Sequence, residues 1–350
     1  MKRHISFPSI DQYKTVVHNL RNNLYYVGKD EQGEPIYNYS KVLPTVTFRG
    51  TIKLHGTNSG VAYSTPDGLW AQSRTNIITP QKDNAGFAFF VENRRNVFIS
   101  LIKEFSEKYA INLDENIITL YGEWAGSGIQ KNVGINQIEK SFFLFGVKVS
   151  PLEPSEKEVS KWYDYSFLES KDNKIYNILN YETYSIDIDL NKPELAQNLL
   201  LEITTKVEEC CPVTRSFGFE GIGEGVVWEY ISPETNVRYL FKVKGEKHAG
   251  KSKVTTLKSV DDQRINQLMS LANSVTPTWR LDQMLTEACD LNNGGIIEKN
   301  KIPQYIKLVI NDIVKEETAL LVENQAEPKD IAKYVTVIAR EYFFMREQQI

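Results

Sequence analysis

The chain has 350 residues, of which 41 % are hydrophobic and 25 % charged, and its formal net charge is −4. This composition is typical of a globular protein with one large and one smaller domain, and no run approaches the roughly 18 apolar residues of a membrane helix. The N-terminus lacks the apolar stretch of a secretory signal and the three cysteines form no disulfide framework, so we expect a cytosolic protein without a membrane partner.

The clearest strand pattern covers residues 45–55. Even positions from Val46 to Leu54 are apolar and odd positions are polar, apart from Gly50, which interrupts the apolar face without changing the period. This alternation predicts a strand with one buried face, and it places Lys53 on the other face.

Several β-like segments follow, and two pairs of them predict hairpins. Pro66-Asp67-Gly68 lies between two such runs, where proline presets φ and glycine accepts positive φ. Ser232-Pro233-Glu234 separates another pair. The predicted strands are 59–64, 69–74, 117–124, 142–149, 225–231 and 236–244.

The pattern becomes helical near residue 258. Apolar stripes at helical spacing begin at Ile265, Leu281 and Ile306, and Pro328 is well placed to open a last helix. We therefore predict an α+β fold with a mixed domain over 1–250 and an all-helical domain over 258–350.

Residues 53–58 combine a lysine on the polar face of a strand with a turn at Gly56. A lysine can act as a nucleophile when neighbouring cations or burial lower its pKa. Glycine lets the backbone approach a ligand closely. Taken alone, however, Lys53 is better explained as an exposed strand lysine beside a turn.

Four more residues suggest a site that binds an anion. Glu123 and Glu224 both lie beside glycine in strand-like segments, and Lys242 and Lys244 share one face of a strand because their spacing is two. Two ammonium groups on one face repel each other unless an anion lies between them, and a nucleotide phosphate would serve. A solvated strand face is the alternative.

Charge is unevenly distributed. The acidic net charge argues weakly against a nucleic-acid partner, because binding phosphates requires Lys and Arg. From Arg238 to Lys258, however, seven basic residues stand against one acid, Glu246. This run is either a solvated surface or a phosphate-binding segment.

Together these residues resemble the covalent nucleotidyltransferases, and most closely the phage-type RNA ligase 2 family with the RNA-editing ligases. Lys53 begins KLHGTN, similar to the family's KxHGTN, and Glu123 lies in GEWAGSGIQKNV, similar to its GE(F/W)AGxGIQKNV. Matches to the remaining blocks, in the family's order, are Ser73-Arg74, Phe145, the EGVV sequence that starts at Glu224, and Lys242 with Lys244.

The chain departs from this family at two places. An aspartate usually follows the aromatic residue that stacks on adenine, whereas Gly146 follows Phe145 here. Residues 153–212 have no counterpart that we can assign.

The resemblance implies a fold, a reaction and a role for each matched residue. The fold would be an ATP-grasp-like adenylyltransferase domain of antiparallel sheets with flanking helices. Lys53 would attack ATP and become adenylylated. The backbone of Ile52 and Leu54 would contact the adenine and Phe145 would stack on it, while Glu123 would bind the ribose. His55 would orient the triphosphate, Lys242 and Lys244 would bind the α-phosphate, and Glu224 would bind Mg²⁺ or Mn²⁺. Asn58 and Arg74 would bind near the ribose and the RNA 5′-phosphate.

The implied function is ATP-dependent RNA ligation, in which AMP passes to a 5′-phosphate and a 3′-hydroxyl then displaces it at a nick in duplex RNA. Lys247, Lys251 and Lys253 would contact RNA, and no obligate protein partner is indicated. Two alternatives stay open. One is a DNA, mixed-polymer or capping-type nucleotidyltransferase of the same superfamily, and the other is a non-catalytic nucleic-acid-binding relative.

Overall fold

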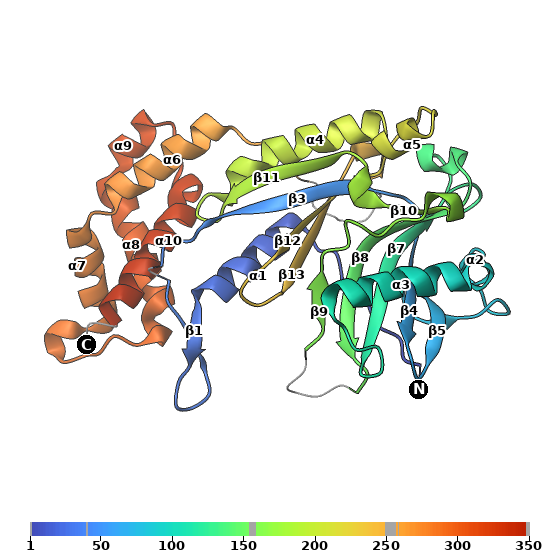
Figure 1. Cartoon of the computed structure of the whole chain (residues 1–350). Helices are drawn as coiled ribbons and strands as arrows, with labels where there is room; N and C mark the ends of the chain where they lie inside the picture. Colours follow the sequence, from blue (N-terminus) through green and yellow to red (C-terminus); the bar gives the residue numbers. More distant parts are fainter. Residues whose placement is uncertain (1, 40, 154–158, 249–256, 258, 348–350) are drawn as a thin grey trace. The chain divides into compact units, whose positions relative to one another are not determined.

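The structure is a computed structural model that describes residues 2–39, 41–153, 159–248, 257 and 259–347. The chain divides into two compact units (Figure 1). Unit 1 comprises Met1–Val16, Val46–Ile188 and Ala196–Lys258, and unit 2 comprises Val17–Thr45, Asp189–Leu195 and Ser259–Ile350. The boundary at residues 16 and 17 falls within helix α1 (Tyr13–Tyr25).

One sheet of unit 1 has the strand order β11-β3-β12-β13. Its strands are β3 (Thr45–Lys53), β11 (Thr183–Asp189), β12 (Gly225–Ile231) and β13 (Arg238–Lys244). Burial alternates along β3 as its sequence predicts. Gly50 lies opposite Trp228 of β12, and a Cβ atom at Gly50 would stand 2.8 Å from the indole, so the glycine makes room for this buried ring.

The other sheet of unit 1 has the order β10-β8-β7-β4-β5-β6, and β9 also pairs with β8. Its strands are β4 (Thr57–Ser64), β5 (Gly68–Ser73), β6 (Ile77–Ile78), β7 (Asn116–Ala125), β8 (Ser141–Pro151), β9 (Lys161–Tyr163) and β10 (Ile175–Asn177). The β4–β5 and β12–β13 hairpins confirm both predicted turns. Of the pairs in this sheet, β10–β8 is parallel and the others are antiparallel.

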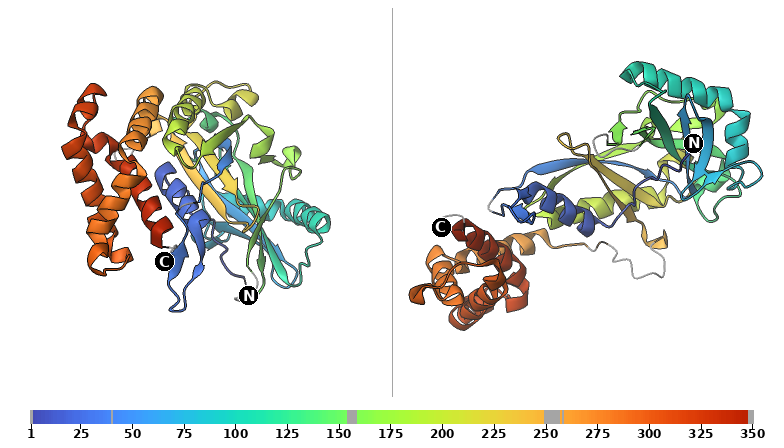
Figure 2. Two further views of the ribbon diagram at one scale, coloured as in Figure 1. Left: turned by 90° about the vertical axis from the view of Figure 1, so that its left-hand side faces the viewer. Right: turned by 90° about the horizontal axis from the view of Figure 1, so that it is seen from below.

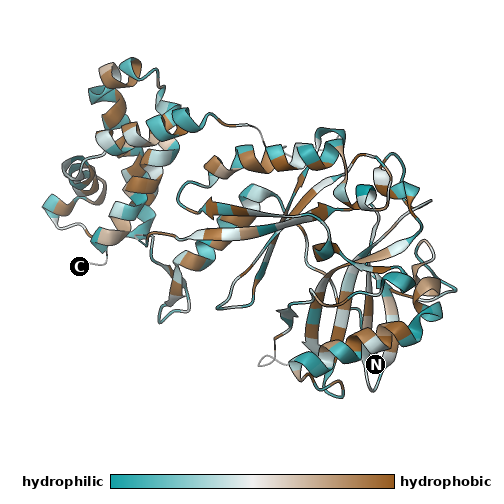
Figure 3. Ribbon diagram, turned by 45° about the horizontal axis from the view of Figure 1, so that its top comes forward, coloured by the Kyte–Doolittle hydropathy of each residue, from teal (hydrophilic) through white to brown (hydrophobic). Residues whose placement is uncertain are grey.

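Helices cover the outer faces of both sheets. Helices α2 (Phe87–Asn93) and α3 (Arg95–Tyr109) pack on β4, β7 and β8 through buried apolar residues, among them Phe98, Leu120 and Phe142. Helix α4 (Gln197–Glu209) packs on β12 and β13, and the short α5 (Pro212–Ser216) follows it. In Figure 3 the brown, hydrophobic positions alternate with teal ones along the strands and helices.

A smaller core lies between the two sheets. It joins Phe7 from the N-terminal segment to Tyr121 of β7 and Leu240 of β13, with Phe145 and Val227 packed against it. This core fixes the inner faces of the two sheets, from which the residues of the candidate site project.

Unit 2 is mainly helical (Figure 2). Its helices are α6 (Asp262–Val275), α7 (Thr278–Cys289), α8 (Ile302–Glu316), α9 (Thr318–Glu323) and α10 (Pro328–Glu347), and its strands are β1 (Tyr26–Lys29) and β2 (Pro35–Tyr37). Each predicted helical stripe forms a helix, and Pro328 is the first residue of α10. Leu195 packs against the helical core, and the rings of Tyr39 and Phe344 lie 4.7 Å apart.

The contacts of Leu195 and Tyr39 with the C-terminal helices show why residues 189–195 and 17–45 belong to unit 2. The α+β organisation with a helical C-terminal part is confirmed. Within the part of the chain that the structure describes, no helix is both long and apolar enough to cross a membrane.

Candidate functional site

Lys53 is the last residue of β3 and lies opposite Gly225 of β12. Its side chain is mostly buried, with 18 % exposed, and its Nζ atom lies 2.7 Å from Oε2 of Glu224. The strand period that places Ile52 in the core therefore points Lys53 at the carboxylate of the residue that precedes the neighbouring strand β12.

Glu224 is the centre of a cluster of nitrogen groups. Its side chain is 1 % exposed, and Lys244 Nζ lies 2.7 Å from its Oε1 while His55 Nδ1 lies 3.3 Å from its Oε2. Burial alone would raise the pKa of Glu224, but the hydrogen bond from His55 and the charges of Lys53 and Lys244 outweigh it, so the pKa is held well below its ordinary value. The carboxylate is therefore ionised.

Lys242 lies beside this cluster and carries no acidic partner within salt-bridge distance among the described residues. Its Nζ donates to the carbonyl of Ile10 at 2.9 Å. Burial, followed by the charges of Lys53 and Lys244, lowers the pKa of Lys242. Its ammonium group is thus available to an anion that enters the site.

Glu123 projects from β7, where Asn58 of β4 is its partner in the register. One of its oxygens accepts the backbone N–H of Gly56 at 2.9 Å. Burial raises the pKa of Glu123 to about 7, against the opposing charge of Lys53. Near neutral pH this carboxyl group is therefore partly ionised and partly protonated. The ionised form only accepts hydrogen bonds, whereas the protonated form can also donate one.

These residues surround a cavity of about 360 Å³ between the two sheets of unit 1. It is lined by eight of the residues that the sequence singled out, namely Ile52, Lys53, Leu54, Asn58, Arg74, Glu123, Phe145 and Lys242. Beside Lys53, His55 and Lys244 each contact Glu224. Arg74 also donates to the carbonyl of Pro8 at 3.3 Å. The structure thus brings these predicted residues together.

A β-bulge aims Phe145 into the cavity. Tyr121 of β7 pairs with Gly146, whereas Gly122 pairs with Leu144, so Phe145 is the extra residue on β8. The ring of Phe145 meets that of Phe7 at 5.0 Å. A bulge turns a side chain out of the regular alternation, which is how this aromatic comes to line the cavity.

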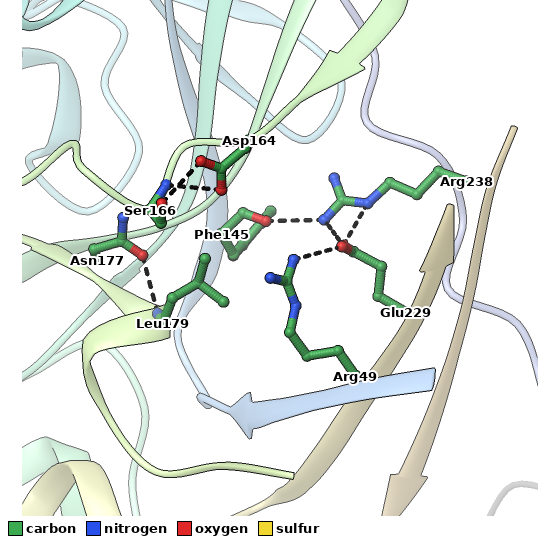
Figure 4. Close-up of polar contacts among 8 residues, drawn as sticks. All are labelled: Arg49, Phe145, Asp164, Ser166, Asn177, Leu179, Glu229 and Arg238. Carbon is green, nitrogen blue, oxygen red and sulfur yellow. Dashed lines mark hydrogen bonds and ion pairs between the residues drawn. The ribbon is translucent and has the colours of Figure 1, made fainter. Parts of the chain in front are cut away.

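Gly146 stands against an arginine from the other sheet. A Cβ atom at Gly146 would lie 2.6 Å from Nη1 of Arg238, and Arg238 Nη2 donates to the carbonyl of Phe145 at 2.9 Å (Figure 4). Arg238 also pairs with Glu229, which accepts from Arg49 at 2.9 Å. The glycine that departs from the family pattern therefore leaves space for a buried guanidinium group.

Sequence reasoning missed several residues that line the cavity. Arg49 and Glu229 share the inward face of Lys53 and Val227, so the period of two could have identified them. Tyr165 and Ile178 come from residues 153–212, whose sequence carries no pattern that indicates a cavity wall.

Of the residues predicted to contact RNA, Arg74 lines the cavity and Lys247 does not. Lys247 is exposed, and its backbone N–H donates to Glu208 at 2.8 Å. Lys251 and Lys253 lie outside the described residues. Among the residues that are described, no group of three or more His, Cys, Asp or Glu side chains could hold a metal ion by itself.

Comparison with known proteins gives one family. Residues 46–244, more than half of the chain, match the RNA ligase family. No curated protein matches the sequence. Similar solved structures include three of RNA ligase from Naegleria gruberi. They are an apo lysine-to-alanine variant (16 % identity, TM-score 0.41), an arginine-to-alanine variant with ATP and Mn (16 %, 0.40) and the ligase with PPi (15 %, 0.38). Each match covers 70 % of this chain and 57 % of the other, so this chain spans little more than half the length of those proteins.

Proposed function

This chain belongs to the RNA ligase family, and we propose that it is an ATP-dependent RNA ligase that becomes adenylylated on Lys53 and seals nicks in duplex RNA. The observation that carries the proposal is the placement of Lys53 at the end of a nucleotide-sized cavity. Its amine lies there among a buried carboxylate, Glu224, and two further lysines, Lys242 and Lys244.

Lys53 would be the nucleophile. Its ammonium group must first lose a proton, because only the neutral amine has a lone pair to donate. The amine would then form a bond to the α-phosphorus of ATP while the bond to pyrophosphate breaks, giving a lysyl–AMP phosphoramidate. Lys242 and Lys244 would stabilise the negative charge that grows on the α-phosphate oxygens during this step.

Glu224 is the residue that would hold Mg²⁺ or Mn²⁺. Magnesium is usually bound by one or two carboxylates together with phosphate oxygens and water, so a single buried carboxylate fits a cation that arrives with ATP. The close approach of three nitrogen groups to Glu224 shows that this position favours positive charge. A bound divalent cation would neutralise part of the triphosphate charge.

The remaining cavity residues would position the nucleoside. Phe145 would stack on the adenine, the backbone of Ile52 and Leu54 would contact its edge, and Glu123 would accept hydrogen bonds from the ribose hydroxyls. His55 would help to orient the triphosphate, and Asn58 and Arg74 would lie near the ribose and the 5′-phosphate of the RNA.

AMP would pass from Lys53 to the 5′-phosphate of one RNA end, and the 3′-hydroxyl of the other end would displace it and close the nick. We assign adenylyl transfer to residues 1–250 and duplex binding to residues 258–350 together with Lys247, Lys251 and Lys253. The cationic run after β13 supports phosphate contact, because RNA backbones attract Lys and Arg without regard to sequence.

Mass spectrometry of the intact protein after incubation with ATP and Mg²⁺ tests the first step. We expect an added mass equal to AMP in the native protein, its loss in Lys53→Ala, and its retention in Lys161→Ala, which removes an exposed lysine on β9. An adduct that persists in Lys53→Ala would rule out Lys53 as the nucleophile. No adduct in the native protein would instead favour a non-catalytic relative.

Sealing rates on nicked duplexes test the substrate. Matched substrates would carry RNA or DNA on each side of the break, and we expect the highest rate with RNA on both sides. Equal rates on DNA would indicate a general polynucleotide ligase, and an adduct formed with GTP in preference to ATP would indicate capping-type chemistry.

A further inference from the structure

The cavity has a second charged end, remote from Lys53. Arg49 precedes Lys53 by four residues on the same face of β3, which separates the two positions by about 13 Å along the strand. Glu229 of β12 is opposite Arg49 in the register, and both side chains line the cavity. A nucleotide whose phosphates lie at Lys53 would therefore direct its base toward this pair.

The pair offers one hydrogen-bond donor and one acceptor side by side. Within the described ranges, Glu229 Oε1 accepts from Arg49 alone, at 2.9 Å, whereas Oε2 accepts from Nε and Nη2 of Arg238. An ionised carboxylate has about four acceptor positions and a guanidinium has five N–H donors. Among the described residues Arg49 donates only to Glu229, and both side chains line the cavity. Arg49 therefore keeps N–H donors, and Glu229 keeps acceptor positions, that a ligand in the cavity could use.

The side chains of Arg49, Glu229 and Arg238 differ in how far they are exposed. The exposed fraction of the side chain is 45 % for Arg49, 11 % for Glu229 and 4 % for Arg238. Arg238 is enclosed and also donates to the carbonyl of Phe145, so it fixes the carboxylate and the stacking aromatic relative to each other (Figure 4). Arg49 is the most exposed of the three, and the less exposed carboxylate of Glu229 also lines the cavity.

Adenine and guanine present different patterns to such a pair. The edge of adenine carries the N6 amine, a donor, beside N7, an acceptor, whereas the same edge of guanine carries two acceptors, O6 and N7. Arg49 and Glu229 complement the adenine edge. Guanine would set its O6 against the carboxylate oxygen, which leaves both acceptors without a donor.

We propose that Arg49 and Glu229 form the base-selecting pair of this cavity, with Arg49 donating to N7 and Glu229 accepting from the N6 amine of adenine. Arg238 is a positioning residue that holds Glu229. The proposal rests on the proposed function, since it concerns the nucleotide that Lys53 would attack.

Nucleotide analogues test it on the native protein, with the initial rate of adduct formation at subsaturating nucleotide as the readout. The analogues are 7-deaza-ATP, which lacks N7, and purine riboside triphosphate, which lacks the amine. A good paired contact to a base edge corresponds to roughly five- to 150-fold in discrimination, and we expect a loss in this range for each analogue and for GTP.

The variant Arg49→Met then links N7 to Arg49. It should bring the rates with ATP and 7-deaza-ATP close to each other while the preference for ATP over purine riboside triphosphate remains. Arg49→Lys, which retains a donor, should keep part of the N7 preference. The matched control is Arg215→Met, which removes an exposed arginine paired with Glu182 and should leave every ratio unchanged.

The outcomes separate this proposal from the one before it. No adduct with any nucleotide would overturn the ligase assignment. An adduct whose rate is the same with ATP and 7-deaza-ATP in the native protein would overturn the base-selecting pair alone, and so would an ATP to 7-deaza-ATP ratio that Arg49→Met leaves unchanged.

Discussion

Replacing Glu224 by glutamine should destabilise unit 1 through uncompensated positive charge. The neutral amide would leave Lys53 and Lys244, both within 2.7 Å of the carboxylate, without a counter-charge. Removing one partner from a buried ion pair costs about 3–5 kcal/mol. Because Lys53 is 18 % and Lys244 33 % exposed and each regains some hydration, we expect a smaller loss of roughly 2–3 kcal/mol in the free energy of unfolding.

The double variant tests the cause. Lys53→Met removes one of the repelling cations, so adding it to Glu224→Gln should cost less than the sum of the two single changes, with a coupling of at least about 1 kcal/mol. Urea unfolding followed by tryptophan fluorescence suits the measurement, because Trp70, Trp124, Trp162 and Trp228 all lie in unit 1.

The control pairs Glu224→Gln with Lys161→Met, whose effects should add. The prediction would be refuted if the unfolding free-energy changes of Glu224→Gln and Lys53→Met also added to within about 0.3 kcal/mol in the double variant. Such additivity would show that the two side chains do not interact.

Three further predictions concern single positions. Gly146→Ala should raise the KM for ATP in adduct formation several-fold and destabilise the protein by about 1–3 kcal/mol. The reason is that the new methyl group would meet the enclosed Arg238 at 2.6 Å. An unchanged KM would contradict this account. Burial raises the pKa of Glu123 from 4.5 to about 7, so the folded protein binds more protons than the unfolded chain between these values. Its stability should therefore fall as the pH rises through this window, and Glu123→Gln should flatten that part of the urea-midpoint profile. Lys247→Ala should lower the slope of log K for duplex RNA against log salt by about 1, and an unaltered slope would exclude a phosphate contact there.

The parts of the fold that the sequence predicts are those set by local periodicity. Strand β3 was predictable because apolar and polar residues alternate through nine positions, and α10 because Pro328 precedes a regular apolar stripe. The face of Lys53 followed from the same alternation. Its neighbours, Glu224 and Lys244, were placed beside it by family resemblance, since no local pattern says that residues 171 positions apart, such as Lys53 and Glu224, are adjacent.

The rest depends on contacts between distant segments. The pairing of Arg238 with Glu229 and the carbonyl of Phe145 requires the two sheets to face each other, which no periodicity reveals. Tyr165 reaches the cavity from a segment of short strands and turns with little regular pattern. The grouping of residues 17–45 with the C-terminal helices likewise depends on contacts such as that of Tyr39 with Phe344.

The local charge of the cavity would allow an acidic chain to bind a polyanion such as the proposed nucleotide. The chain carries a net charge of −4, yet the cavity is lined by five cationic side chains and two carboxyl groups. The cationic residues are Arg49, Lys53, Arg74, Arg238 and Lys242, and the acidic ones are Glu123 and Glu229. Glu123 is only partly ionised near neutral pH, which makes the excess of positive charge larger. At an ionic strength of 0.15 M, charges more than about 8 Å apart in solvent are largely screened, so under the proposed function these neighbours would decide the affinity for a triphosphate and the distant acids would not.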